Sequence, residues 1–486
     1  MARSTRRRRG AALAAGLAAA TLLAACGGSA DDAEDTSEEQ GTAEDPGTAD
    51  EPDAAGPAEA PSSGPPEAGS DGPPVPEDVE LPELEGYADL SGQTVEVATP
   101  WTGHERDRFD EVVVAFEEAT GARVDQLGLG GNPVLAITES LDNGRPPNIS
   151  FVGDRGLVEA LAEDGSIVPL REETLASVEE SYAQTWIDLG SVDDEVYAVW
   201  LEASTNSLFW YDTAAYAEAG VEAPETWEEL GEALRTVSGT GVAGLAVAVD
   251  LGWTLTDWFE NAYLRVAGPE AYDQLVAREI PWTDPSVVDT LELLGELWSD
   301  EEIVLEGGAD RTYPDSVENV FGDEPSAATL VGGEIVADSI VGQTDAVVGE
   351  DARFYPWPAI EGSAPSVVGD AAGAVAFDEE QGTAELMRYL ASPEAANTWI
   401  ELGGSPAPNR QADLDLYDDD VSRELAQQIV DAEVFRLDMS GLMAPDFGSN
   451  QLEGLWPILS DFYDDPSDPE ATAQALEDAA LDVYGY

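Results

Sequence analysis

The sequence predicts an α/β fold arranged in two lobes, and three observations support this prediction. Strand-like segments alternate with amphipathic helices between residues 94 and 162, which indicates a mainly parallel sheet flanked by helices. The region from Leu90 to Tyr486 mixes apolar with charged residues and carries all 12 tryptophans. At about 400 residues, this region is long enough to bury two separate hydrophobic cores.

The first predicted elements follow one another at short intervals. Thr94–Ala98 alternates as a half-buried strand does, and a helix is expected over Glu105–Thr120, where apolar residues recur at helical spacing. Gly121 marks the end of that helix. The pattern then repeats, with a strand from Val124, a buried strand over Asn148–Val152 and a helix over residues 157–162.

Two loops follow strands of this predicted sheet, over residues 100–105 and 153–155. Ligands of parallel sheets usually bind beyond the carboxyl ends of the strands. Both loops are therefore candidates for a binding site.

The later part of the chain is predicted to be richer in helices. Strands are expected over Glu195–Leu201 and Leu208–Tyr211, and a helix opens after Pro224 with Thr226 as its N-cap. Further helices are expected over Asp284–Trp298, within Thr383–Leu402, over Arg423–Phe435 and from about Asp468 to Val483.

The N-terminus has the features of a bacterial export signal. Five arginines precede a short apolar run, which is too short to span a bilayer and ends in Leu23-Ala24-Ala25-Cys26. This ending resembles the lipoprotein signal, in which the cysteine is acylated and becomes the mature N-terminus. The alternative is an ordinary secretory signal, but an exported chain with a single cysteine forms no internal disulfide.

Residues 27–88 are dominated by Ala, Asp, Glu, Gly, Pro and Ser, and they are predicted to form a disordered acidic tether after the signal of residues 1–26. No later apolar run approaches the length of a membrane span. A lipid on Cys26 would therefore be the anchor to the cell membrane.

Composition excludes several classes of function. The chain has 101 acidic and 20 basic residues, and its net charge of −81 argues against binding to nucleic acid. One histidine and one cysteine cannot form a His/Cys zinc site, and a Ser-His-Asp triad would depend on His104 alone. We therefore expect no cofactor, no metal ion and no catalytic residue, although paired carboxylates of the glycosidase type remain open.

Tryptophans recur beside carboxylates in the predicted loops, as Trp101 with Glu105, Trp253 with Asp257 and Trp357 upstream of Asp370. Aromatic faces pack on the apolar face of a sugar ring while carboxylates bind its hydroxyls. Any single tryptophan is more often a core residue. The recurrence of the pair is what indicates a sugar site.

Several motifs in their order resemble the extracellular solute-binding proteins of ABC importers. They include Trp101-Thr102-Gly103-His104-Glu105, Ser207-Leu208-Phe209-Trp210-Tyr211-Asp212, Ala223-Pro224-Glu225-Thr226-Trp227 and Tyr389-Leu390-Ala391-Ser392-Pro393-Glu394. The block Gly252-Trp253-Thr254-Leu255-Thr256-Asp257-Trp258, with Ile280-Pro281-Trp282-Thr283-Asp284-Pro285, is similar to the branch that binds α-glucosides. The resemblance covers nearly all of residues 90–486.

The resemblance implies a type II periplasmic-binding-protein-like clamp, with crossover strands as hinge and a central cleft. Lobe 1 would comprise 89–203 and 369–410, and lobe 2 would comprise 204–368 and 411–486. The crossovers would fall near residues 202–206, 368–374 and 405–410.

The resemblance also implies the residues that face the sugar. Lobe 1 would contribute His104 and Glu105, together with Asp154 and Arg155. Trp253 and Asp257 would come from lobe 2, and Asp370 and Arg410 from the crossovers. Trp101 and Trp357 join this set through their neighbouring carboxylates. Asn206 departs from the family, which usually has lysine there.

Alternatives stay open for several of these residues and for the function. Asp154 and Asp257 could each cap a helix, and Arg155 and Arg410 could form surface ion pairs. The resemblance implies a monomeric lipoprotein receptor that delivers a carbohydrate to permease subunits. An extracellular glycoside-active enzyme and a surface lipoprotein without transport function are the alternatives.

Overall fold

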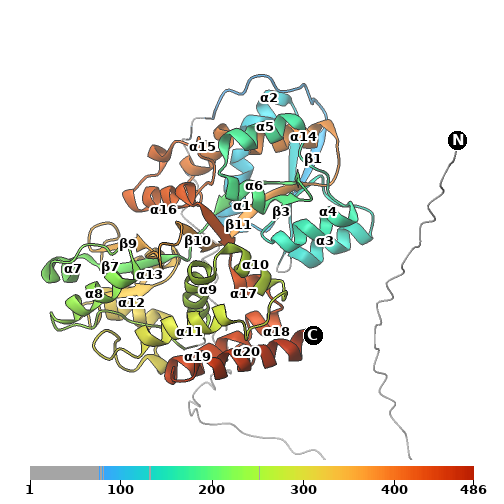
Figure 1. Ribbon diagram of the computed structural model, residues 1–486. Helices are drawn as coiled ribbons and strands as arrows, with labels where there is room; N and C mark the ends of the chain where they lie inside the picture. The colour runs from blue at the N-terminus through green and yellow to red at the C-terminus, as the bar shows by residue number, and fades with distance from the viewer. Residues whose placement is uncertain (1–75, 77–78, 80, 131–132, 251, 486) are drawn as a thin grey trace, which may run out of the picture. The chain divides into compact units, whose positions relative to one another are not determined.

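The computed structural model describes residues 76, 79, 81–130, 133–250 and 252–485, which form two lobes with separate cores (Figure 1). The predicted signal sequence with Cys26 lies outside the described residues, as does most of the predicted tether. The first residue along the chain in the core of one lobe is Leu90, and the first in the core of the other lobe is Leu208.

The first lobe is built on a five-stranded sheet in the order β2-β1-β3-β11-β6. Strand β1 runs parallel to β2 and β3, as predicted, whereas β11 is antiparallel to β3 and β6. The strands of this sheet are β1 (Thr94–Thr99), β2 (Arg123–Gly128), β3 (Ile149–Val152), β6 (Ala198–Ala203) and β11 (Ala371–Ala376). The expected strand over 195–201 is divided, because β5 (Glu195–Val196) pairs instead with β4 (Ser191–Val192).

The helix expected over 105–120 is two helices, α1 (Gly103–Val112) and α2 (Val114–Thr120), which meet at Val113. Gly121 ends α2 in the left-handed conformation with φ 72°, as its position predicted. The other helices of this lobe are α3 (Pro133–Asp142), α4 (Arg155–Asp164), α5 (Glu172–Ser181), α6 (Gln184–Leu189), α14 (Gln381–Leu390) and α15 (Pro393–Glu401).

The second lobe surrounds an antiparallel sheet in the order β8-β7-β9. These strands are β7 (Leu208–Asp212), β8 (Thr329–Val331) and β9 (Ala352–Pro356). The N-cap predicted at Thr226 is present as a full capping box with Glu229. The helices are α7 (Thr213–Ala219), α8 (Trp227–Ser238), α9 (Trp253–Ala267), α10 (Pro269–Val276), α11 (Pro285–Trp298), α12 (Tyr313–Phe321), α13 (Ile335–Gln343), α17 (Met439–Leu442), α18 (Pro445–Gly448), α19 (Leu455–Asp464) and α20 (Pro469–Tyr484).

Two crossover segments connect the lobes and are hydrogen-bonded to each other. Residues 204–207 lead from β6 to β7, and Asp370 links β10 (Ser366–Gly369) to β11. The backbone N–H of Ser204 donates to the Asp370 carbonyl at 2.8 Å, and that of Asn206 donates to the Val368 carbonyl at 2.7 Å. Gly369 permits this approach, because a Cβ there would lie 2.1 Å from the Ser204 carbonyl oxygen.

A third connection follows α15 and leads through α16 (Asp420–Asp431) to β12 (Val434–Leu437), which pairs in parallel with β10. The helix predicted over 423–435 therefore ends at Asp431, and its last predicted residue, Phe435, belongs to a strand. Helix α16 contacts both cores, through Leu425 on one side and Ile429 on the other. The division of the lobes at residues 410 and 411 stays a proposal.

The last residues of the predicted tether pack against the first lobe. Leu81, Leu84 and Tyr87 are partly buried against its core. The guanidinium of Arg388 lies 3.7 Å from the centre of the Tyr87 ring, and it donates a hydrogen bond to the Gly86 carbonyl. These closely spaced apolar side chains bury surface against the first lobe. The Ala-, Pro- and acid-rich sequence before them offers few side chains of this kind.

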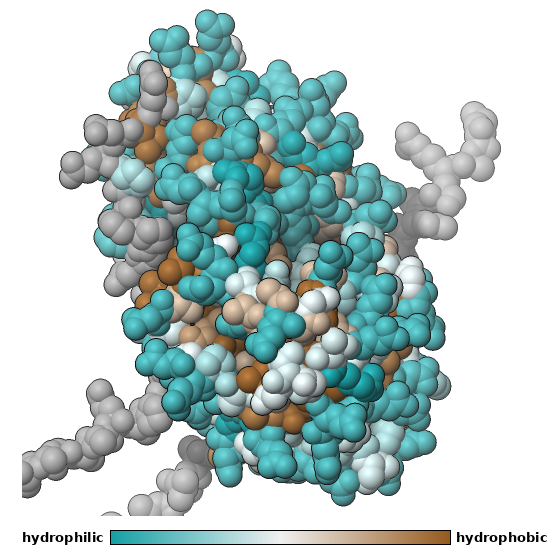
Figure 2. All heavy atoms as spheres, turned by 90° about the vertical axis from the view of Figure 1, so that its left-hand side faces the viewer, coloured by the Kyte–Doolittle hydropathy of each residue, from teal (hydrophilic) through white to brown (hydrophobic). Residues whose placement is uncertain are grey.

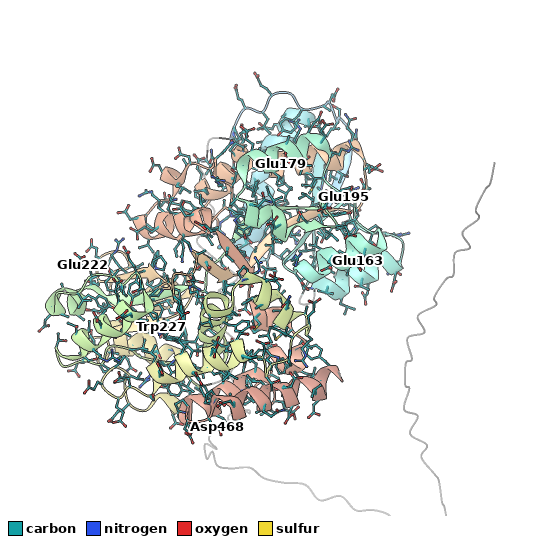
Figure 3. The ribbon with its side chains drawn as sticks, in the orientation of Figure 1. Glu163, Glu179, Glu195, Glu222, Trp227 and Asp468 are labelled. Atoms are coloured by element: carbon teal, nitrogen blue, oxygen red, sulfur yellow. The ribbon has the colours of Figure 1, made fainter. Side chains whose placement is uncertain are left out.

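Acidic side chains are spread over the described surface of both lobes. Exposed examples on helices, a strand and loops are Glu163, Glu179, Glu195, Glu222 and Asp468 (Figure 3). Hydrophilic residues cover most of the face in Figure 2, with apolar patches between them. Among the described residues, none of the helices is both long enough and apolar enough to traverse a bilayer.

Candidate functional site

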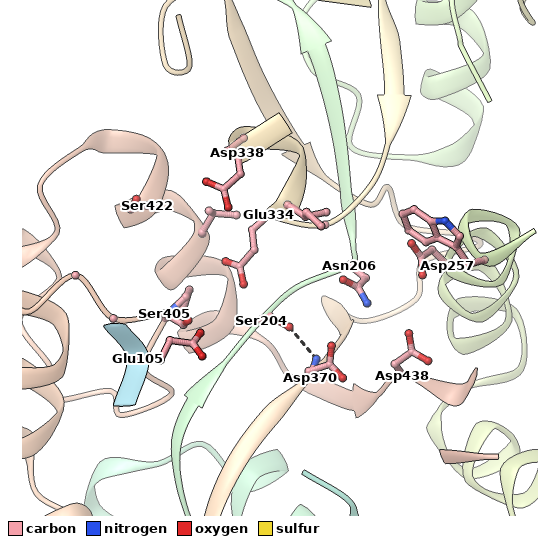
Figure 4. A pocket seen from close by; sticks show the side chains of 18 of the residues that line it. Glu105, Ser204, Asn206, Asp257, Glu334, Asp338, Asp370, Ser405, Ser422 and Asp438 are labelled. Carbon is pink, nitrogen blue, oxygen red and sulfur yellow. Dashed lines mark hydrogen bonds between the residues drawn. The ribbon is translucent and has the colours of Figure 1, made fainter. Parts of the chain in front are cut away.

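A cavity of about 640 Å³ lies between the lobes at the crossover segments (Figure 4). Its volume falls in the range of sites that enclose small organic ligands, about 300–1,000 Å³. The first lobe contributes Glu105 and residues 403–406, and the crossovers contribute Ser204, Asn206 and Asp370. The second lobe contributes the start of α9, the start of α13 and Trp456 of α19.

Four of the residues proposed from the sequence line this cavity: Glu105, Trp253, Asp257 and Asp370. Glu105 lies in the first turn of α1, and Asp370 lies between β10 and β11. Trp253 and Asp257 lie four residues apart on α9 and so share a face of that helix. Asp257 caps no helix, since the N-cap of α9 is Gly252.

Gly252 also determines how the aromatic wall of the cavity is built. Its φ is 79°, and a Cβ there would lie 2.6 Å from the Trp456 carbonyl oxygen. A glycine at this position therefore lets α19 approach the start of α9 closely. Trp253 and Trp456 both line the cavity.

The two other tryptophans of the proposed set are core residues that do not line the cavity. Trp101 packs against Phe109 and Phe151, and its Nε1 donates to Glu202 Oε1 at 2.7 Å. Trp357 is buried in the second core, where it packs edge-on against Phe209 and Trp258. Both tryptophans are therefore core residues, which is the alternative to a sugar-binding role that the sequence left open.

His104, Asp154, Arg155 and Arg410 also do not line this cavity. Asp154 is the N-cap of α4 and accepts a hydrogen bond from the Gly156 N–H at 2.7 Å, which is the capping alternative stated above. His104 is exposed, with Nδ1 3.8 Å from Asp107. Arg410 is also exposed. A role in the site for these four stays a proposal.

Five lining residues with strong chemical character were missed by the sequence reasoning, which named none of them as candidates: Arg108, Glu334, Asp338, Asp438 and Trp456. Glu334 precedes α13 directly after two glycines, and Asp438 follows the half-buried strand β12. A carboxylate immediately after a strand is a signal that could have indicated Asp438. Trp456 has no such local signal, because only the folded chain brings α19 to this cavity.

The cavity is strongly acidic, and burial raises the pKa of most of its carboxyl groups. Desolvation is the largest cause at Glu334, whose pKa rises to about 8, with further contributions from Glu202, Asp338 and Asp370. Desolvation likewise raises the pKa of Glu202 to about 7, against the hydrogen bond from Trp101. Burial and the neighbouring Asp438 raise the pKa of Asp257 well above its ordinary value.

Arg108 is the one basic residue that lines the cavity within the described part of the chain. Its Nε donates to the Leu402 carbonyl at 2.9 Å, which ties it to the first lobe. Burial lowers the pKa of its guanidinium, while Glu105 and Glu202 raise it. The site therefore presents many hydrogen-bond acceptors and few donors, a composition that suits a ligand rich in hydroxyl groups.

Residues 102–397 match the family model of the bacterial extracellular solute-binding proteins. This match covers more than half of the chain. The chain belongs to the bacterial extracellular solute-binding proteins. Members of this family are binding proteins that act outside the cytoplasm, and the cavity between the lobes is the place where such a protein would hold its solute.

Curated relatives extend the match over most of this solute-binding protein. It is 32% identical over 371 residues to the osmoprotective compounds-binding protein GgtB of a Synechocystis species, covering 74% of this chain and 86% of the relative. It is 28% identical over 411 residues to the alpha-glucosides-binding periplasmic protein AglE of Rhizobium meliloti, covering 81% and 88%.

The solved structure of the bacterial solute receptor AcbH shares the fold with a TM-score of 0.71 at 18% identity. That likeness covers 80% of this chain and 100% of AcbH. The predicted type II clamp is therefore confirmed.

Proposed function

We propose that this solute-binding protein captures an extracellular sugar, an α-glucoside or a related oligosaccharide, and delivers it to the permease of an ABC importer. The observation that carries the proposal is the cavity between the lobes, which is lined by two tryptophans and several carboxylates, among them Trp253, Trp456, Asp257, Asp370 and Glu334. Indole faces pack on the C–H face of a pyranose, and carboxylates accept hydrogen bonds from its hydroxyls.

The relatives support the same class of ligand. AglE is named for binding alpha-glucosides, and the receptor AcbH is described as preferring β-D-galactopyranose exclusively. GgtB is named for osmoprotective compounds, which adds solutes of that kind to those to be tested.

In this proposal the protein is a receptor that performs no catalysis and works as a monomer. Lipid on Cys26 would hold it at the cell membrane, and the acidic residues after it would let the lobes reach the medium and the permease. Replacing Cys26 with serine should release the full chain into the culture medium, and retention of that variant at the membrane would contradict lipid anchoring.

The ligand class is tested by thermal unfolding of the full chain with a panel of maltose, trehalose, sucrose, cellobiose, galactose and glycine betaine. A sugar at 100 times its dissociation constant stabilises the folded chain by about 2.7 kcal/mol, which raises the unfolding temperature measurably. We expect the α-linked disaccharides to give the largest shifts.

The same mixtures are then analysed by chromatography for products. Unchanged sugar is expected. Hydrolysis or transglycosylation would contradict the receptor function and favour a glycoside-active enzyme. No shift with any member of the panel would favour a surface lipoprotein without transport function.

A further inference from the structure

Three carboxylates, two of them buried and one partly exposed, converge at the wall of the cavity, in an arrangement that sugar binding does not require. Asp257 and Glu260 lie three residues apart on one face of α9, and Asp438 follows β12. One carboxylate oxygen from each of the three lies within 4.8 Å of the others. Asp257 is 6% exposed and Glu260 is 1% exposed.

Each carboxylate keeps an oxygen that makes no hydrogen bond with the described residues. Glu260 accepts from the Met439 N–H with Oε2 at 2.7 Å, while its Oε1 is buried and unpartnered. Asp438 accepts from Ser440 and Gly441 with Oδ1 alone. Neither carboxylate oxygen of Asp257 takes part in a hydrogen bond among the described residues. A buried acceptor without a partner is costly, so the unpartnered Glu260 Oε1 indicates that something absent from the protein chain satisfies it. The free oxygens of Asp257 and Asp438 belong to residues that line the cavity.

No positive side chain balances this cluster in the part of the chain that the structure describes. None of the ion pairs found there includes Asp257, Glu260 or Asp438, and Asp370 adds a fourth carboxylate nearby. Arg436 is paired with Asp273, and Arg265 is bound to Asn261 and to the Ser366 carbonyl. Buried carboxylates of this kind either share protons or bind a cation.

The geometry matches the requirements of calcium. This ion takes six to eight oxygen ligands at about 2.3–2.6 Å, so two oxygens on the same ion lie no more than about 5 Å apart. Three carboxylates binding through one or both oxygens would supply three to six of these ligands, and water from the cavity would complete the shell. The chain lacks a His/Cys ligand set, but this oxygen set is of the type that calcium prefers.

We propose that Asp257, Glu260 and Asp438 hold a divalent cation, with calcium as the ion whose ligand preference they match. Because Asp257 and Asp438 line the cavity, the ion would occupy its wall and join α9 to the end of β12. Its remaining coordination positions would face the solute, so that sugar hydroxyls could replace water there. The ion site itself does not depend on which solute is bound.

The site is tested by titrating the full chain with Tb³⁺ in 150 mM salt, without sugar, while exciting tryptophan. Trp253 and Trp456 line the same cavity and should sensitise Tb³⁺ emission. We expect emission that saturates with one ion per chain and is displaced by Ca²⁺. Absence of sensitised emission, or emission that Ca²⁺ does not displace, would overturn the proposal.

The location is tested with the variant D257N/E260Q, because both substitutions keep the shape of the side chain and its capacity to accept a hydrogen bond. The control D461N/D464N removes two charges at the same spacing from the exposed face of α19. The first variant should lose the Ca²⁺-displaceable emission and the increase in unfolding temperature that Ca²⁺ produces, and the control should keep both.

Equal loss in both variants, or full retention in D257N/E260Q, would show that the ion binds elsewhere. Because no sugar is present, failure of this test leaves the proposed sugar binding to be tested by the panel above.

Discussion

Replacing Glu334 with glutamine should remove a large pH dependence from the stability of the protein. Glu334 has a pKa of about 8 in the folded chain, compared with 4.5 for an ordinary glutamate, because the cavity desolvates it and three carboxylates surround it. Between these two values the folded chain holds a proton that the unfolded chain has released. The stability that this proton provides is fully present below pH 4.5 and is lost as the pH rises through 8.

The magnitude follows from the two pKa values. Each pH unit between them changes the free energy of unfolding by about 1.4 kcal/mol, so Glu334 should lower it by about 3 kcal/mol between pH 5 and pH 8. Glutamine stays neutral across this range. The difference in the free energy of unfolding between E334Q and the original chain should therefore grow in favour of E334Q by about the same amount from pH 5 to pH 8.

The assay is urea unfolding of the full chain, followed by tryptophan fluorescence at pH 5, 6, 7 and 8. E163Q is the control, because Glu163 is exposed on α4 (Figure 3). The stability of E163Q should follow that of the original chain at every pH. If the E334Q difference were also constant with pH, the cavity would not hold Glu334 in its protonated form, and the reasoning from desolvation would be refuted.

Three further changes test the binding site, the hinge and the N-terminal boundary. Trp253→Ala should weaken sugar binding at least about tenfold in calorimetric titrations, while Trp253→Phe keeps much of the affinity, since an aromatic face remains. Unchanged affinity in the alanine variant would remove this indole from the site. Gly369→Ala should cost about 1–3 kcal/mol in unfolding measurements, because its Cβ would meet backbone at 2.1 Å, whereas Gly342→Ala on an open face of α13 should stabilise by about 0.5–1 kcal/mol. Equal effects of the two would contradict the close crossover contact. A chain that begins at residue 89 should unfold at a lower temperature than one that begins at residue 76, because it loses Tyr87 and its contact with Arg388. Identical unfolding temperatures would show that this segment adds no stability.

Local patterns predicted the first lobe well, because neighbouring residues determine strands and helix ends. The alternation in Thr94–Ala98 and the glycine at 121 both correspond to what the structure has. The single helix expected over 105–120 is two helices that meet at Val113, since the apolar residues keep their helical spacing across this junction. The residues that follow α16 were misassigned to the helix for a related reason: Phe435 is apolar in either element, and only its pairing with β10 identifies a strand.

The candidate site was only partly predictable, because tertiary contacts decide which polar groups face the cavity. Trp253 and Asp257 were accessible to sequence reasoning, since one helix face carries both. Trp357 has the same local pattern of an aromatic upstream of a carboxylate, but strand β9 directs the chain so that its indole enters the core. Glu334 and Asp438 reach the cavity from distant segments. The position of Asp438 directly after a strand is a local signal for that residue alone, and it does not indicate that the two carboxylates meet.

The most direct test of the account is a crystal structure of the protein with the sugar that gives the largest shift in the panel. We expect one sugar in the cavity between the lobes, with a pyranose face on Trp253 and hydroxyl groups bonded to Asp257 or Asp370. A sugar bound outside this cavity, or one inside it that touches residues of a single lobe, would contradict the central claim that both lobes together hold the solute.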